Sequence, residues 1–205
     1  MRAREEDPLV SGRASQETRE RYVRNIIGVW HAATPAQEER GRTWYRAAHQ
    51  LAALIANGDV RSGAGVLAAL SANKSWAQNC QLAQRAMATG IPSGHVGDAL
   101  NKASKIIAGA DPLEVLPIER KTGMFFRCIA DPEDPDAVVI DRHAHDIAVG
   151  ETYGNRGRGL SNSRRYSLLA DCYREAARRL GELPSTVQAV TWVVHKHAGP
   201  VTATP

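Results

Sequence analysis

One stretch decides the fold class: Trp44-Tyr45-Arg46-Ala47-Ala48-His49-Gln50-Leu51-Ala52-Ala53-Leu54-Ile55. Its apolar residues recur at every third or fourth position, which is the spacing of a helix with one buried face. The pair Asn57-Gly58 follows as a helix-ending signal, and Thr34-Pro35 marks the preceding boundary. The sequence therefore predicts a long amphipathic helix at this place.

Helical spacing continues outward from this stretch in both directions. The expected helices cover residues 18–30, 64–70, 76–89, 95–108, 120–129, 141–149, 163–180 and 185–196, with a short helical turn after Asp111-Pro112. The run Val138-Val139-Ile140 is β-branched but too short and isolated for a sheet, so we expect an extended stub. Residues 187–194 are also rich in β-branched side chains, yet their apolar positions fit one helix face. We therefore predict an all-α protein of about eight to ten helices.

The length and the two ends predict the organisation of the chain. A chain of 205 residues suits one domain or one globule of two lobes, which we expect over residues 17–198. Residues 1–16 and 199–205 lack an apolar period, so both ends are expected to be flexible. The sequence contains no signal-type or membrane-spanning apolar run, which favours a cytoplasmic protein.

The charge distribution offers a partner hypothesis that the net charge does not. The net charge of +4 is too small to name a partner. Residues 156–179, however, contain seven arginines against only Asp171 and Glu175. Such a cluster suits a phosphate backbone, because guanidinium groups bind phosphate bidentately, but a solvated helix face explains it equally well.

Two short segments carry a family resemblance: Leu116-Pro117-Ile118-Glu119-Arg120-Lys121-Thr122 and Val138-Val139-Ile140-Asp141-Arg142-His143. In order and spacing they resemble the catalytic segment of helix-hairpin-helix DNA glycosylases of the endonuclease III type. That family has Leu-Pro, a glycine hairpin, Lys-Thr, an apolar helix and then Val-Asp-Thr-His. The resemblance extends over roughly residues 61–196, and it implies an all-α bundle in two lobes.

The resemblance implies an enzyme of DNA repair that removes a damaged or modified base. Lys121 would be the nucleophile, forming a Schiff base that also permits strand cleavage, and Asp141 would stabilise the cationic sugar. The first turn of a helix and the neighbouring Arg120 favour the neutral amine that this reaction requires. DNA is the expected partner, with no membrane, metal or cofactor. The expected substrate-binding residues are Asn73, Trp76, Gln78, Thr122 and His143, and the expected phosphate-binding residues are Arg120, Arg156, Arg158, Arg164 and Arg165.

The sequence departs from the family pattern at the hairpin and at the cluster ligands. Ile118-Glu119-Arg120 stands where the family has a Gly-X-Gly turn, and Glu119 would repel a phosphate there. The substrate is then a nucleotide or an unusual DNA, as in related enzymes that build hypermodified thymidine. Only three cysteines, Cys80, Cys128 and Cys172, are present and they lie far apart, which excludes an iron–sulfur cluster.

Several alternative interpretations stay open at this point. Lys121 can be a solvated helix lysine and Asp141 a helix cap, in a DNA-binding module or a transferase of the same fold. The dipeptide His145-Asp146 is typical of a metal-dependent HD-type phosphohydrolase, which would need further ligands. His49, His95 and Asp171 are the candidates for those ligands, and Trp44 and Trp192 are candidates for stacking on a base.

Overall fold

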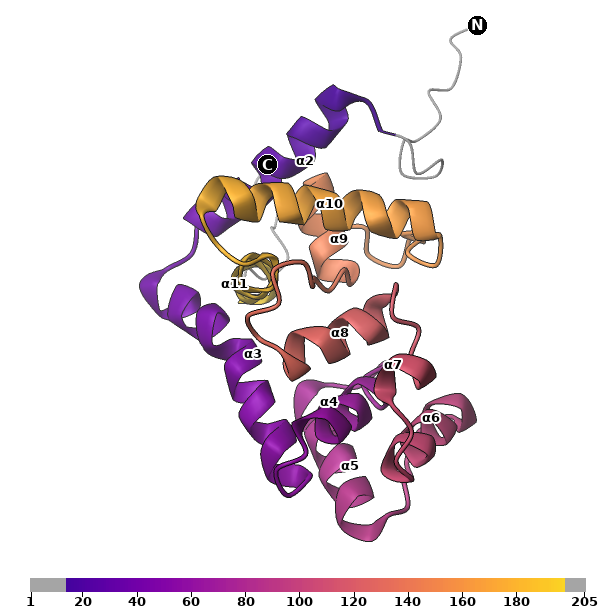
Figure 1. Ribbon diagram of the computed structural model, residues 1–205. Coiled ribbons are helices and arrows are strands. Elements are labelled where there is room, and N and C mark those ends of the chain that lie inside the picture. The colour runs from indigo at the N-terminus through magenta and orange to yellow at the C-terminus, as the bar shows by residue number, and fades with distance from the viewer. Residues whose placement is uncertain (1–13, 198–205) are drawn as a thin grey trace, which may run out of the picture. The chain divides into compact units, whose positions relative to one another are not determined.

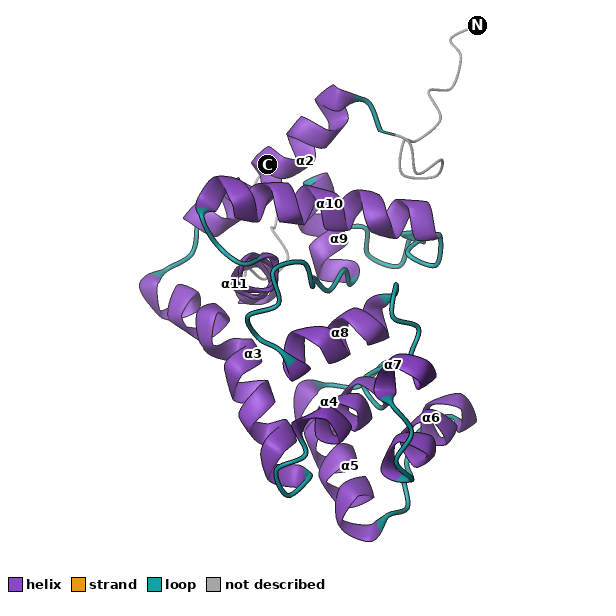
Figure 2. Cartoon of the chain, in the orientation of Figure 1, coloured by secondary structure: helices purple, strands orange, loops and turns teal. Residues whose placement is uncertain are grey.

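The computed structural model describes residues 14–197, and within that range every regular element is a helix (Figures 1 and 2). The all-α prediction is confirmed. The helices are α2 (Gln16–His31), α3 (Pro35–Ile55), α4 (Val60–Ala69), α5 (Trp76–Thr89), α6 (Gly97–Ile107), α7 (Pro112–Val115), α8 (Lys121–Ala130), α9 (Arg142–Val149), α10 (Ser163–Leu180) and α11 (Pro184–His197). None of these helices is long and apolar enough to cross a bilayer.

Helix boundaries follow the capping residues more closely than the apolar period. Helix α2 begins two residues before the predicted start, because the Ser15 hydroxyl accepts a hydrogen bond from the Thr18 amide. Helix α6 begins two residues late, since Val96 is extended and its amide donates to the imidazole of His95. The predicted flexible ends, 1–16 and 199–205, lie outside the described residues except for 14–16.

The β-branched segments behave as the sequence indicates. Residues 138–140 form a buried extended segment that is not part of a sheet within the described chain. Residues 187–194 are helical in α11, with Val187, Val190 and Val193 buried at one face. Burial of one stripe therefore outweighs the local β preference of these residues.

The described residues form two compact units. The first contains residues 14–44 and 138–197, in which α2 packs against α9, α10 and α11. The second contains residues 45–137, in which the buried helix α4 packs against α5, α6, α7 and α8. Helix α3 contributes to both units, because the boundary falls between Trp44 and Tyr45.

Small residues explain why α4 occupies the centre of the second unit. All residues from Gly63 to Leu70 are buried, and most are glycine or alanine. A β-carbon at Gly63 would fall on the carbonyl oxygen of Ala52 in α3. Only glycine therefore permits the observed contact between the backbones of α3 and α4.

We predict that Gly63→Ala lowers the free energy of unfolding by about 1 to 3 kcal/mol, because the methyl group meets a backbone that cannot move aside. The matched control is Gly28→Ala on α2, where a β-carbon meets nothing within 4 Å. That variant should be more stable than the wild type by about 0.5 to 1 kcal/mol. Urea unfolding followed by circular dichroism measures both. Equal stability of the two variants would contradict the close contact.

Candidate functional site

Lys121 stands at the start of α8 in the second unit, directly after a tight turn. The Arg120 amide donates to the Pro117 carbonyl oxygen at 2.9 Å, which closes the turn. A β-carbon at Gly123 would fall on the backbone of Pro117 and Ile118, so the turn packs directly on the first turn of α8. Lys121 itself is exposed and has no hydrogen-bond or ion-pair partner within residues 14–197.

An aromatic cluster lies one turn further along α8. Phe125 is four residues after Lys121 and therefore lies on the same helix face. The ring of Trp76 meets Phe125 edge-on at 6.3 Å, and Tyr45 meets it at 6.4 Å. Of the predicted substrate-binding residues, the structure thus brings Trp76 to the Lys121 face of α8. Thr122, the second residue of α8, is half-buried.

Two other predicted substrate-binding residues have local structural roles. Asn73 is exposed in the loop between α4 and α5, with a φ of 56° that asparagine tolerates better than most residues. The side-chain oxygen of Gln78 accepts a hydrogen bond from the Ser75 amide, and the Ser75 hydroxyl accepts one from the Gln78 amide. This capping box engages the side chain of Gln78, which was predicted to bind substrate.

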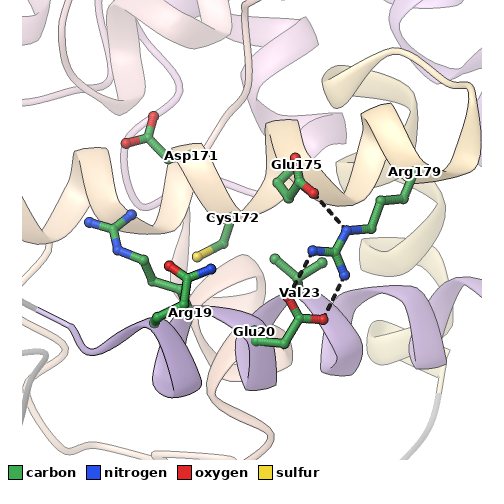
Figure 3. A pocket seen from close by; sticks show the side chains of 8 residues that line it. Arg19, Glu20, Val23, Asp171, Cys172, Glu175 and Arg179 are labelled. Atoms are coloured by element: carbon green, nitrogen blue, oxygen red, sulfur yellow. Dashed lines mark hydrogen bonds and ion pairs between the residues drawn. The ribbon is translucent and has the colours of Figure 1, made fainter.

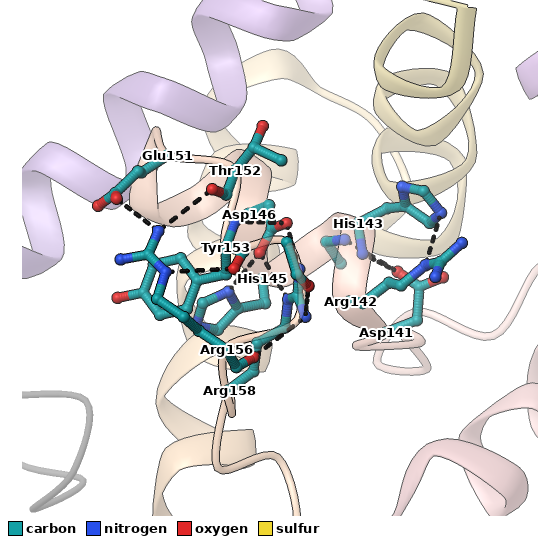
Figure 4. A network of polar contacts seen from close by, with 12 residues as sticks. Asp141, Arg142, His143, His145, Asp146, Glu151, Thr152, Tyr153, Arg156 and Arg158 are labelled. Atoms are coloured by element: carbon teal, nitrogen blue, oxygen red, sulfur yellow. Dashed lines mark hydrogen bonds and ion pairs between the residues drawn. The ribbon is translucent and has the colours of Figure 1, made fainter. Parts of the chain in front are cut away.

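Asp141 caps α9 in the first unit and uses one oxygen to do so. Its Oδ1 accepts hydrogen bonds from the amides of His143 and Ala144, both at 2.9 Å (Figure 4). Its Oδ2 accepts no hydrogen bond within the described range. The capping interpretation is therefore correct, and it leaves half of the carboxylate available.

His143, the next predicted site residue, belongs to an aromatic and basic cluster beside Asp141. Its Nδ1 lies 3.1 Å from Nδ1 of His195, and its ring meets Trp192 edge-on at 6.1 Å. The ring centroids of Trp44 and Trp192 are 6.4 Å apart. The Lys196 ammonium lies over the Trp192 ring, 4.4 Å from its centroid. Burial lowers the pKa of His143 below its ordinary value.

A buried polar network lies in α9 next to this cluster. His145 is fully buried, and its Nδ1 lies 2.8 Å from Oδ1 of Asp146. Its Nε2 lies 3.0 Å from the guanidinium of Arg165, which is itself only 4% exposed. Because a guanidinium only donates, Nε2 accepts and Nδ1 carries the proton, so His145 is neutral. Burial lowers the pKa of His145 accordingly.

Arg158 completes this network from the glycine-rich loop before α10. Its Nε and a terminal nitrogen donate to both oxygens of Asp146 at 2.7 Å (Figure 4). Burial by itself would raise the pKa of Asp146, but the Arg158 hydrogen bonds hold it below its ordinary value. The Tyr153 amide also donates to Asp146, and the Tyr153 ring lies 4.6 Å from that of His145.

These contacts show where the predicted phosphate-binding residues lie. Arg158 and Arg165 hold the buried network and would have to leave it to meet a phosphate. Arg156 is exposed, although it pairs with Glu151 and lies over the Tyr153 ring. Arg164 is exposed, and its guanidinium has no partner within the described chain. Arg120 is half-buried at the N-cap of α8.

The later arginines of the basic segment are neutralised by neighbouring carboxylates. Arg174 pairs with Asp171, and Arg178 pairs with Glu175. Arg179 lies between Glu175 and Glu20, its nitrogens 2.6 Å from each. This half of α10 therefore fits the solvated-face interpretation.

The metal site that a phosphohydrolase would need is absent from the part of the chain that the structure describes. No group of three or more histidine, cysteine, aspartate or glutamate residues between 14 and 197 is placed to hold a metal ion. Asp146 is occupied by Arg158, and the proposed further ligands His49 and His95 bind backbone oxygens. We therefore do not retain this alternative.

A shallow pocket of about 150 Å³ lies between α2 and α10 (Figure 3). Asp171, a candidate metal ligand, lines it, but the predicted catalytic, substrate-binding and phosphate-binding residues do not. The ion pairs of Arg179 line it, and hydrogen bonds from Arg178 and Arg179 lower the pKa of Glu175 to about 2. Burial raises the pKa of the Cys172 thiol to about 11, so this thiol is unreactive at neutral pH. The pocket is a structural contact of the two helices.

We predict that the protein loses stability as the pH falls, through His145. In the unfolded chain a histidine has a pKa of about 6.5, while folding lowers the pKa of His145. Above that pH both states are neutral at this residue, and below it the unfolded chain alone gains the proton. The free energy of unfolding should therefore fall below about pH 6.5. Urea unfolding at a series of pH values measures this slope.

The dependence of the unfolding free energy on pH should be weaker in His145→Gln. The dependence that remains is due to His143, whose pKa is also lowered. The control His31→Gln, at the exposed end of α2, should show the wild-type dependence. A His145→Gln variant with the full wild-type slope would refute the assignment of His145 as neutral.

The sequence matches the model of one protein family. Residues 10–199 match the model described as "Family of unknown function (DUF7178)", which spans nearly the whole chain and both units. No curated protein and no solved structure matches the chain. The chain therefore belongs to this family of unknown function, DUF7178.

Proposed function

We propose that this protein is a DNA glycosylase-like enzyme that removes a damaged or modified base, with Lys121 as nucleophile and Asp141 as its acidic partner. One observation carries the proposal: each residue stands at a helix start and keeps a reactive atom without a protein partner in the described chain. These atoms are Nζ of Lys121 and Oδ2 of Asp141. The solvated-lysine interpretation explains Lys121, and the simple-cap interpretation explains Asp141. Neither explains why both residues lie in the segments that resemble helix-hairpin-helix DNA glycosylases.

The chemistry of the proposed reaction follows from an amine and a carboxylate. The neutral Lys121 amine bonds to C1′ of the nucleotide while the C1′–N bond breaks, and its electron pair leaves with the base. The departing base takes a proton from water, which leaves hydroxide. The nitrogen loses a proton to Asp141, which passes it to O4′ as the C1′–O4′ bond breaks, and a protonated Schiff base remains. Hydroxide adds to its carbon, and collapse of the adduct returns the amine and an aldehyde sugar. Asp141 also stabilises the positive charge on the sugar.

The aromatic cluster on α8 supports a base as the substrate. A nucleotide that leaves the helical stack needs an apolar or aromatic surface for its base. Trp76 and Phe125 offer such a surface one turn from Lys121.

An exposed apolar pair in the second unit supports DNA as the partner. His95 binds the carbonyl oxygen of Ala72, which joins the loop before α6 to the loop that carries Asn73. In the same loop, Ile91 is 71% exposed, and Val96, which follows His95, is 67% exposed. Apolar side chains of this kind enter the base stack of a duplex when a nucleotide is displaced. Ile91 was not among the residues predicted from the sequence, where its only signal is its place between Gly90 and a proline.

We predict that sodium borohydride traps the protein on an oligonucleotide that contains an abasic site. Lys121→Gln should abolish the adduct, because it removes the amine that forms the Schiff base. Lys105→Gln on α6, which changes another exposed lysine of the same unit, is the matched control and should keep the adduct. Gel electrophoresis of the reduced mixture measures it. An undiminished adduct in Lys121→Gln would remove Lys121 from the reaction.

We also predict that Asp141→Asn slows strand cleavage at an abasic site by about a hundredfold or more. Asparagine caps a helix as well as aspartate does, so the fold should be retained. Asp59→Asn is the control, because Asp59 caps α4 in the same way through the Ser62 amide. Wild-type cleavage rates in Asp141→Asn would leave this residue with its capping role alone.

A further inference from the structure

The first unit contains a hydrogen-bond relay whose protons can be assigned from its donors. Nε of Arg142 donates to Nε2 of His143 at 3.2 Å (Figure 4). Because Nε2 accepts, the single proton of neutral His143 is on Nδ1. That Nδ1 donates to Nδ1 of His195 at 3.1 Å, so the proton of His195 is on Nε2. The relay therefore ends in one N–H donor, at His195 Nε2.

The contacts of the relay oppose a second proton on either imidazole. An additional proton on His195 would place two N–H groups against each other at 3.1 Å, and one on His143 would oppose the Arg142 donor. The charged groups that act on His143 are Asp141 and Asp146, which favour its protonation, and Arg142, which opposes it. Burial is the largest influence, and the pKa of His143 is lowered.

The donor at His195 has no acceptor among the described side chains. His195 is partly exposed, and its Nε2 has no hydrogen-bond partner within residues 14–196. Beside it in α11 lie the Trp192 ring and the Lys196 ammonium, which the ring already binds. On the other side of the relay, His143 adjoins Asp141. The relay therefore orients this N–H group, and the group is available to a ligand.

The surroundings of this donor favour a neutral acceptor over a phosphate. A phosphate would be better served by a cationic histidine, and the contacts of the relay oppose a second proton on either ring. The aromatic rings of Trp44 and Trp192 suit a base.

We propose that His195 Nε2 donates a hydrogen bond to a keto oxygen of a nucleobase, and that the Arg142–His143–His195 relay makes the site select keto bases over amino bases. This subsite rests on the proposed function, since its ligand is a base of the same DNA. An amino group at the same position would place two donors against each other, and the site would reject it.

Equilibrium binding to oligodeoxyuridine and oligodeoxycytidine of equal length tests the proposal, because these bases differ in a keto and an amino group. The wild type should prefer oligodeoxyuridine by about twofold to tenfold, the value of one hydrogen bond. His195→Phe keeps the ring and removes the donor, so the ratio should fall to near one. His31→Phe, at an exposed histidine of the same unit, should retain the wild-type ratio.

A second variant tests the relay without changing His195. Arg142→Met removes the donor that orients His143, so the pair can adopt the opposite proton arrangement and the ratio should again approach one. Arg24→Met removes an equal charge from α2 and should change both affinities by the same factor. Nitrogen-15 spectra of the wild type should show the proton of His143 on Nδ1 and that of His195 on Nε2.

The outcomes separate this proposal from the glycosylase proposal. The keto-base subsite is overturned if the wild type shows no preference, binds neither oligonucleotide, or keeps its preference in His195→Phe. It is also overturned if His195→Phe weakens both affinities equally, which would assign the donor to a backbone phosphate. A protein that forms no borohydride adduct but keeps the keto preference refutes the glycosylase proposal alone.

Discussion

The buried ion pair between Asp146 and Arg158 is the interaction on which the first unit depends. Both side chains are largely removed from solvent, so leaving either charge alone would cost about 3 to 5 kcal/mol. Asp146 also accepts from His145, which in turn accepts from Arg165. One carboxylate thereby joins α9, α10 and the glycine-rich loop between them. The positions of the α9 residues around it follow from this network.

The N-terminus of α9 presents the two groups on which the proposals depend. Asp141 uses Oδ1 to cap the helix and keeps Oδ2 free of protein donors in the described chain. One turn of helix carries both this carboxylate and His143, whose proton arrangement is set by Arg142. The start of α8 in the second unit depends on Gly123. Only glycine at this position allows the turn before Lys121 to pack on α8.

Helix content was predictable because it depends on local spacing and capping. Even residues 187–194 form a helix, as their apolar stripe indicates. The arginines of residues 156–179 were less predictable, because charge along the sequence does not show which side chains meet a carboxylate. Arg158 and Arg165 turn inward to the buried network, while Arg174, Arg178 and Arg179 pair on the surface. Arg156 and Arg164 are exposed as well.

By itself, the sequence determined the helices and the places of Lys121 and Asp141 at the starts of two of them. Only the tertiary structure decided that His145 and Asp146 bind arginines, and that His195 meets His143. The physical reason is distance along the chain. Capping and helical spacing act over a few residues, whereas His143 and His195 meet only when α9 and α11 pack together.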